Sequence, residues 1–172
     1  MQLLDIREFN DLLRNCKYRA FHLETQDEYA VDSEADDLAE YLKTGTFDET
    51  WSSWENLIKE VTDKGIVVQR ARVVSEPHTD YTRFLHATTR INIASGEDVR
   101  WLPRSDIDPT QLTTDDWWTL DDEVVAFTAF RTDGNLGGLA VTTDPVIVQY
   151  CNSVREVVWS VATPHAEYFP KQ

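Results

Sequence analysis

The pattern of apolar and polar positions after residue 65 predicts alternating strands and helices. Residues 66–74 form a β-branched, apolar run that is interrupted only by Gln69, Arg70 and Arg72. Such a run is typical of a strand that is covered on both faces. An amphipathic helix is expected over residues 79–93 and another strand over residues 99–102, so these three elements form a βαβ unit.

Three more strands and a long final helix are expected after this unit. The strands cover residues 117–120, 124–130 and 138–142. Asp144-Pro145 begins the helix, because proline is favoured at the first helical position. Cys151 lies on the apolar stripe of this helix, which predicts a buried thiol rather than a reactive one.

The first 64 residues predict helices and a small pair of strands. The expected helices are residues 5–15, 33–43 and 48–63, with Ser33 and Asp48 opening the second and third. Leu38, Tyr41 and Leu42 are expected to be the buried positions of the second helix. A strand over residues 18–24 is expected to pair with residues 29–31.

The predicted fold class is α/β, with an α+β N-terminal part and a mixed sheet flanked by helices. The helices and short strands change to the α/β pattern near Lys64. This predicts an N-terminal subdomain of residues 1–64 and an α/β domain of residues 65–172, packed as one compact unit.

The acidic net charge of the chain limits the classes of macromolecule that it is expected to bind. The chain has 16 basic and 31 acidic side chains, for a net charge of −15. We therefore expect no direct nucleic acid binding, which needs basic clusters, and no attraction to anionic membranes. Ten acidic residues and one lysine lie between Glu24 and Glu49. This segment is either a solvated acidic face or a docking surface for a basic protein partner.

Sequence motifs support neither a cofactor nor a metal. No glycine-rich phosphate loop occurs, and the four histidines lack the spacings of zinc sites. No cofactor and no metal are therefore expected. Cys16 and Cys151 are too far apart in sequence for a paired motif, and neither a signal peptide nor a membrane span is apparent. A cytoplasmic location is the expectation.

The candidate functional edge is the segment of residues 70–84, where the strongest strand passes into a helix. Ligands of α/β sheets bind beyond the carboxyl ends of strands, which is where this joint lies. The candidate ligand or partner residues in it and in the later strands are Arg72, Ser75, Glu76, Asp80, Tyr81, Arg83, Trp118, Asp121 and Asp122. The alternative is an ion-pair network among Arg72, Glu76, Asp80 and Arg83 that only holds the helix against the sheet.

The order of elements after Ile66 resembles one half of the phospholipase D-like fold. That superfamily uses a His-x-Lys motif followed by Asp five residues after the lysine. Aligning Asp121 with this Asp puts Thr114 and Asp116 at the His and Lys positions. Aligning Asp122 with this Asp instead puts Asp115 and Trp117 at the His and Lys positions. The resemblance therefore implies the fold without its phosphodiester chemistry, because the nucleophile and the cationic clamp are missing.

A second resemblance extends over nearly the whole chain. Its segments are Arg72-Val-Val-Ser-Glu-Pro, Gly96-Glu-Asp-Val-Arg-Trp-Leu-Pro-Arg104, Trp117-Trp118, Thr143-Asp-Pro145 and Pro164-His165. As a set they are similar to an uncharacterised actinobacterial family of small proteins. Its members are often encoded beside helix-turn-helix regulators, which implies a regulatory role and supplies no catalytic residues.

Three functions remain open from the sequence. The first is a non-catalytic regulatory or interaction protein that partners a DNA-binding regulator. The second is a small-molecule sensor whose pocket is formed by residues 72–83 and Trp118. The third is a hydrolase that uses Glu76, Asp121 and Asp122.

Overall fold

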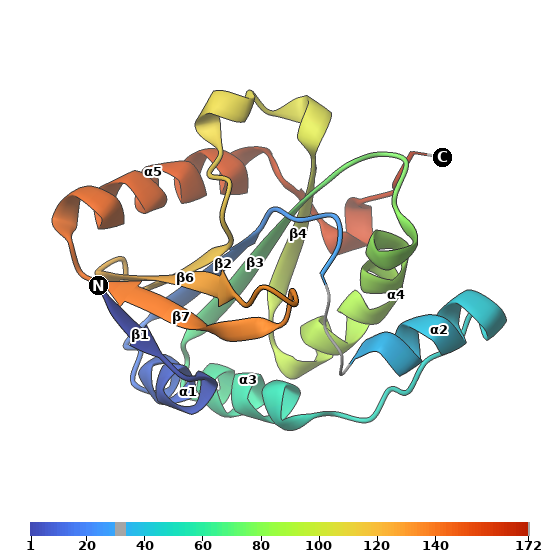
Figure 1. The fold of residues 1–172 in the computed structure, drawn as a ribbon, viewed down its shortest axis with the longest axis horizontal. Helices are drawn as coiled ribbons and strands as arrows, with labels where there is room; N and C mark the ends of the chain where they lie inside the picture. Colours follow the sequence, from blue (N-terminus) through green and yellow to red (C-terminus); the bar gives the residue numbers. More distant parts are fainter. Residues whose placement is uncertain (30–33, 172) are drawn as a thin grey trace.

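One mixed β-sheet forms the centre of the molecule (Figure 1). The computed structural model describes residues 1–29 and 34–171. Within these residues eight strands pair in the order β1-β7-β6-β5-β2-β3-β4-β8. Strands β2, β3 and β4 are parallel, and all other neighbours are antiparallel.

Most of the elements have the bounds that the hydrophobic pattern predicts. The strands are β1 (Gln2–Leu4), β2 (Arg19–Glu24), β3 (Val67–Val74), β4 (Asp98–Pro103), β5 (Trp117–Leu120), β6 (Val124–Phe130), β7 (Leu136–Thr142) and β8 (Thr163–Pro164). The α-helices are α1 (Ile6–Arg14), α2 (Ala35–Thr44), α3 (Ser53–Asp63), α4 (Asp80–Ser95) and α5 (Pro145–Val161). Short 3-10 turns lie at Arg104–Asp106, Pro109–Gln111 and His165–Glu167.

The predicted mixed sheet flanked by helices is confirmed. Strands β3 and β4 are parallel and α4 joins them, so the predicted βαβ unit is present. Strand β2, from the first 64 residues, lies between β5 and β3. Both halves of the chain therefore contribute to a single sheet, and a central strand comes from the segment that was assigned to the N-terminal subdomain.

Helices cover the two faces of the sheet unequally (Figure 1). On one face α5 packs over the apolar positions of the central strands, with Ala71 and Val73 of β3 among them. On the other face α1 and α3 cover the start of the same strands, including Val68. Side chains alternate along a strand, so Arg70 and Arg72 share this second face with Val68. The charged side chains of Arg70 and Arg72 thus lie on a face of the sheet against which helices pack.

Helix α3 begins later than the sequence pattern suggested. The expectation that Asp48 opens this helix is wrong. Ser52 is the N-cap, and its hydroxyl accepts from the Trp54 N–H while Glu55 accepts from the Ser52 N–H. This capping box satisfies two free amide donors, whereas Asp48 accepts only from Thr50 in the preceding turn.

Two details of the N-terminal part also differ from expectation. Leu42 is 49% exposed and is not a core position of α2, although Leu38 and Tyr41 are partly buried. Strand β1 was not predicted, because only one of its three residues is buried. The expected strand at residues 29–31 and the Ser33 cap lie largely or wholly outside the described residues; Tyr29 itself is not in a strand.

Cys151 is fully buried, as predicted, in the core between α5 and the sheet. Burial raises the pKa of its thiol to about 11, so the thiol stays protonated at neutral pH. Among the described residues no helix has both the length and the apolar character that a membrane crossing requires.

The turn between β5 and β6 is fastened to the start of β2 by Asp121. Its carboxylate accepts the backbone N–H groups of Lys17, Tyr18 and Arg19 at 2.8, 3.0 and 3.1 Å. These hydrogen bonds favour the charged form, and the pKa of Asp121 is lowered although partial burial opposes that shift. Asp121 itself has φ of 51°, a left-handed conformation that Asp tolerates better than most residues.

Replacing Asp121 with Ala should lower the free energy of unfolding by about 2 kcal/mol, because three backbone donors lose their acceptor and Ala disfavours a positive φ. Asp121→Asn should cost less, since one acceptor oxygen remains and Asn tolerates the backbone conformation. Urea unfolding measures both changes. Equal midpoints for Asp121→Ala and the wild type would show that this turn is not an anchor.

Candidate functional site

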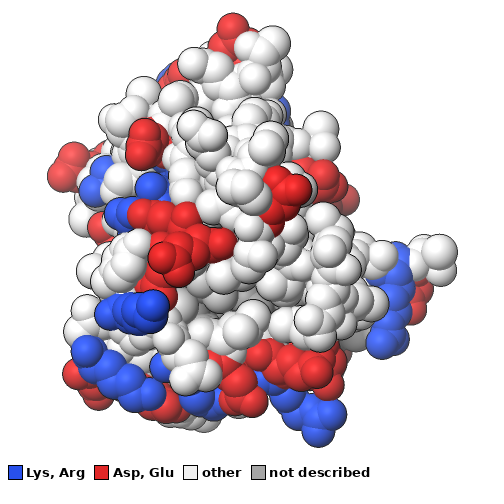
Figure 2. Space-filling view, turned by 90° about the vertical axis from the view of Figure 1, so that its left-hand side faces the viewer, with Lys and Arg blue, Asp and Glu red and all other residues white. Residues whose placement is uncertain are grey.

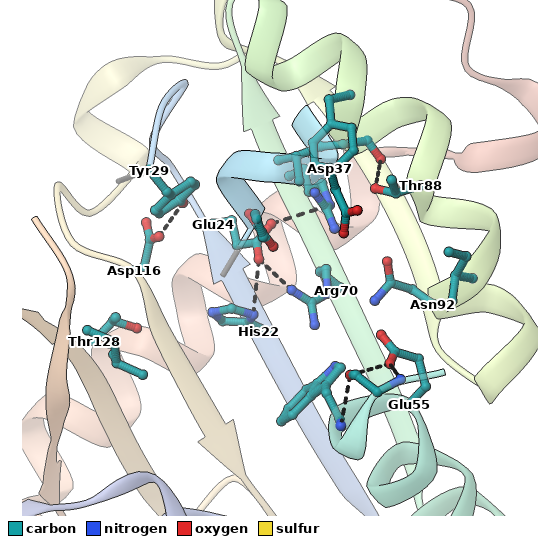
Figure 3. Close-up of a pocket in the computed structure, with 18 of the residues that line it drawn as sticks. His22, Glu24, Tyr29, Asp37, Glu55, Arg70, Thr88, Asn92, Asp116 and Thr128 are labelled. Atoms are coloured by element: carbon teal, nitrogen blue, oxygen red, sulfur yellow. Dashed lines mark hydrogen bonds and ion pairs between the residues drawn. The ribbon is translucent and has the colours of Figure 1, made fainter. Parts of the chain in front are cut away.

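A pocket of about 560 Å³ lies on the sheet face that carries the two arginines (Figure 3). Its floor comes from β2, β3 and β5, which contribute His22, Arg70 and Trp118 among others. Helices α2, α3 and α4 contribute to the walls, together with the segment between α2 and α3. The pocket therefore occupies the part of this face that the helices leave uncovered.

A buried ion cluster lies at the floor. Arg70 pairs with Glu24 through Nη1 and with Glu97 through Nε, the latter at 2.6 Å. A second nitrogen, Nη2, donates to Glu97 Oε1 at 3.1 Å, so the contact is bidentate. The Trp54 indole also donates to Glu97 at 3.1 Å. Arg70 is thus held between two carboxylates in the interior.

Arg72 is equally buried but less well paired. Its Nε lies 3.3 Å from Glu24 Oε2, and its guanidinium stands 5.4 Å from the centre of the Trp101 ring. The side chain is only 5% exposed, yet Nε and Nη1 have no hydrogen-bond acceptor within the part of the chain that is described. A buried donor without a partner is costly, so this side chain requires an explanation.

His22 lies flat against Trp118 beside the cluster. The ring centres are 4.2 Å apart and the planes differ by 10°. Burial lowers the pKa of His22 to about 3, and Arg70 and Arg72 act in the same direction while Glu24 opposes them. The imidazole is therefore neutral at pH 7. Its Nδ1 is 3.5 Å from Glu24 Oε1.

Two more carboxylates line the pocket, of which Asp116 is buried and Glu34 is partly buried. Asp116 accepts the Tyr29 hydroxyl and both the N–H and the hydroxyl of Thr25, at 2.7 and 2.8 Å for the Thr25 pair. Glu34 accepts the Tyr81 hydroxyl at 2.7 Å. Burial raises the pKa of both acids, although these hydrogen bonds oppose the rise. The hydrogen-bond donors are neutral groups, and neither acid forms an ion pair within the described residues, although Arg72 and Arg70 lie near enough to Glu34 to oppose the rise of its pKa.

Aromatic rings form much of the remaining lining. They come from helices, strands and loops that are far apart in the sequence. The aromatic side chains other than His22 are Phe9, Tyr29, Phe47, Trp54, Tyr81, Phe84, Trp118 and Phe130. Pockets of this kind, with an apolar wall and a few placed polar groups, are typical of small-molecule sites.

Within the described residues no three His, Cys, Asp or Glu side chains are grouped as a metal site would require. The polar side chains that line the pocket carry carboxylates, guanidinium groups, hydroxyls, the Asn92 carboxamide, indole N–H groups and one neutral imidazole. They can hold an organic molecule by hydrogen bonds and charge.

Three of the nine predicted site residues line the pocket: Arg72, Tyr81 and Trp118. They come from β3, α4 and β5. The structure therefore brings these three side chains to one pocket, and their role in binding a ligand stays a prediction. The pocket, however, lies over the sheet face rather than beyond the end of β3.

Other predicted residues at the joint have structural partners away from the pocket. Ser75 bonds the Asp27 carboxylate through its N–H and its hydroxyl, both at 2.7 Å. Glu76 accepts the Tyr168 hydroxyl at 2.8 Å. Arg83 pairs with Asp80 one turn earlier on the exposed side of α4.

The network predicted among Arg72, Glu76, Asp80 and Arg83 is therefore not formed as a whole. Only the pair between Asp80 and Arg83 is present. Arg72 points across the parallel strands to Glu24, which the register places directly opposite it. Glu24 and Arg72 are 48 residues apart in sequence, so this pairing between β2 and β3 could not be read from the local sequence.

Asp121 and Asp122 lie at the other end of the sheet. Asp122 pairs with Arg19 and Arg155, and Asp121 binds the backbone that leads into β2. Glu76 follows the opposite end of β3. The three carboxylates of the hydrolase hypothesis are consequently not brought together.

The sequence interpretation missed most of the pocket's charged residues. His22 and Glu24 alternate on β2 as Arg70 and Arg72 do on β3, and the register pairs His22 with Arg70 and Glu24 with Arg72. Charged residues at alternate positions of two central strands were the available signal. In the sequence, Asp116 stands out only as the residue at the Lys position of the His-x-Lys motif, which this chain lacks.

A comparison with models of protein families shows to which family the chain belongs. The model for a family described as a domain of unknown function, DUF6879, matches residues 7–170. The chain belongs to the DUF6879 family. No curated protein matches it. Membership confirms the expected likeness to a family of unknown function, while its actinobacterial origin and the implied neighbourhood of helix-turn-helix regulators stay predictions.

Glu97→Gln should lower the free energy of unfolding by about 3 kcal/mol, because removing one charge leaves the buried Arg70 only partly compensated. Denaturant unfolding measures the loss. The matched control is Glu156→Gln on α5, where the side chain is 75% exposed, and no measurable change is expected there. A similarly small effect at Glu97 would contradict the assigned role of the cluster.

The stability of the protein should fall as the pH drops below 6.5, partly through His22. This histidine has a pKa of about 3 in the folded protein and 6.5 when unfolded, so in this interval the unfolded chain binds the extra proton. Between pH 7 and pH 5, His22→Gln should therefore lose less stability than the wild type. Unfolding midpoints measure the difference. Parallel curves below pH 6.5 would be inconsistent with a neutral buried His22.

Proposed function

We propose that this DUF6879 protein is a small-molecule binding protein, and that its ligand occupies the pocket over β2, β3 and β5. The observation that supports the proposal most directly is the buried guanidinium of Arg72. Arg72 lines a pocket of about 560 Å³, and two of its nitrogens have no hydrogen-bond acceptor among the described residues, although Nε lies 3.3 Å from Glu24 Oε2 in an ion pair. A ligand oxygen would supply that acceptor.

The energetic argument rests on the cost of such a group. An unsatisfied buried donor costs about 1–3 kcal/mol, and more when the group is charged. A folded protein tolerates that cost when a water or a ligand satisfies the group in the functional state. An oxygen acceptor that binds Arg72 would recover part of it.

Recognition is better supported than bond cleavage. Glu24 and Glu97 are held in ion pairs, and His22 is neutral and stacked on Trp118. The carboxylates of the hydrolase alternative lie at opposite ends of the sheet. We therefore favour a sensor, in which binding changes the interactions of the protein. The phospholipase D-like relationship remains a proposal about ancestry of the fold only.

A regulatory partner remains part of the proposal. Helix α2 presents Asp36 and Glu40 to solvent and also contributes Asp37 to the pocket. A ligand that contacts Asp37 could change how α2 is displayed to a protein partner, such as a DNA-binding regulator. On the face seen in Figure 2, acidic side chains gather in a patch with basic ones nearby, which is compatible with a protein surface as partner.

Filling the pocket should abolish ligand binding. Thr88 is a partly buried residue of α4 that lines the pocket, and Thr88→Trp would occupy its volume. We expect that a metabolite library will contain compounds that shift the indole N–H signals of wild-type Trp54 or Trp118 in ¹H–¹⁵N spectra. These shifts should be absent in Thr88→Trp.

Ser153→Trp is the control, because Ser153 is exposed on α5 at the other face of the sheet. This variant should bind as the wild type does. Unchanged backbone spectra would establish that both variants are folded. Binding that survives in Thr88→Trp, or a library that leaves both indole signals in place, would refute the pocket as a ligand site.

A further inference from the structure

The residues that line the pocket carry more negative than positive charges. Its two lining cations, Arg70 and Arg72, are matched by the buried carboxylates of Glu24 and Glu97. The lining contains five further carboxylates, which belong to Glu34, Asp37, Asp48, Glu55 and Asp116. Among the described residues none of these five forms an ion pair with a Lys, Arg or His side chain.

Two of these acids, the buried Asp116 and the partly buried Glu34, have neutral hydrogen-bond donors as their partners. Tyr81 donates to Glu34, and Tyr29 and Thr25 donate to Asp116. Burial raises the pKa of both carboxyl groups, and the nearby Arg72 and Arg70 offset that rise for Glu34 only in part. An added positive charge beside them would stabilise their ionised forms. Asp37, which is partly buried, lies between Glu24 and Thr88 in the view of Figure 3.

An independent observation indicates a second polar group on the same ligand. Arg72 lines the pocket, its side chain is 5% exposed, and its Nε and Nη1 have no hydrogen-bond acceptor among the described residues. Glu24 already lies beside its Nε, so the full charge of an anion is not needed there. A neutral oxygen, such as a hydroxyl or carbonyl, would satisfy the remaining donor.

The lining also favours a cation over a purely polar solute. Aromatic faces attract cations through their quadrupoles, and carboxylates beside aromatic rings strengthen this attraction. Tyr29 and Tyr81 are close neighbours, with ring centres 5.7 Å apart, and they donate their hydroxyls to Asp116 and Glu34 respectively. An ammonium group placed near these two rings would lie close to both carboxylates.

We propose that the ligand is a small organic cation: an amine with an apolar or aromatic body and one neutral oxygen acceptor. Its ammonium group lies among Glu34, Asp37 and Asp116, and its oxygen accepts from Arg72. Phosphorylated compounds and other anions are excluded by the five unpaired carboxylates. This inference rests on the proposed function and specifies the ligand class of the same pocket.

The test uses a fragment library in matched sets, in which each body is present as an amino alcohol, as the alcohol without the amine, and as a carboxylate. Phenylalaninol, 3-phenyl-1-propanol and 3-phenylpropionate form one such set. Binding is followed by the indole signals of Trp54 and Trp118 and by titration calorimetry on the full chain. The amino alcohols should bind at least about tenfold more tightly than the other two forms.

Variants locate the ammonium group. Glu34→Gln and Asp37→Asn each remove one charge, and each should weaken amine binding about tenfold or more while leaving the alcohols unchanged. Both positions are outside the fully buried core, and unchanged amide spectra would confirm folding. Glu156→Gln is the control, because its exposed carboxylate on α5 lies on the other face of the sheet. It should bind amines as the wild type does.

Two negative results can be told apart. If alcohols or carboxylates bind as well as amines and Thr88→Trp blocks them, the pocket binds ligands but the cation inference is wrong. The same conclusion follows if Glu34→Gln and Asp37→Asn bind amines as tightly as Glu156→Gln does. If no member of any set shifts the indole signals, both the cation inference and the proposed function fail.

Discussion

The buried contact between Arg70 and its two carboxylates is the constraint on which the site depends. A guanidinium in the interior is tolerated only when opposite charges and hydrogen bonds compensate for lost water. Glu24 comes from the neighbouring parallel strand β2, and Glu97 is the residue immediately before β4. The cluster therefore ties β2, β3 and β4 together across one face of the sheet.

The charge of Arg72 is less fully compensated than the charge of Arg70, and the pocket follows from this difference between the two arginines. Arg72 shares Glu24 with Arg70, but it lacks the second carboxylate that Glu97 provides to Arg70. The helices cover the apolar start of the central strands and leave their charged part beneath a cavity. Carboxylates on α2, α3 and the loops then line this opening, and within the described residues they form no ion pairs. Fold, pocket and the proposed ligand preference are thus linked through one arrangement of charge.

Much of the fold could be predicted because local rules and burial agree in this chain. The apolar run of β3, the Thr79 cap of α4 and the Asp144-Pro145 start of α5 each combine periodicity with a terminal signal. Where two signals competed the prediction was wrong. Asp48 has the residue type of a helix cap, but Ser52 and Glu55 form the complete capping box, so α3 begins four residues later than expected.

The sequence by itself determined that the protein has a mixed α/β sheet, an acidic surface and a charged pair of arginines on its strongest strand. It could not determine which side chains meet those arginines, because strand register between distant segments is set by packing of the whole sheet. Only the tertiary structure placed Glu24 beside Arg70 and Arg72, and Trp118 against His22. It also assigned Asp121 to a backbone anchor far from Glu76. Local sequence carries the periodicity of an element, whereas a site is formed by contacts between elements.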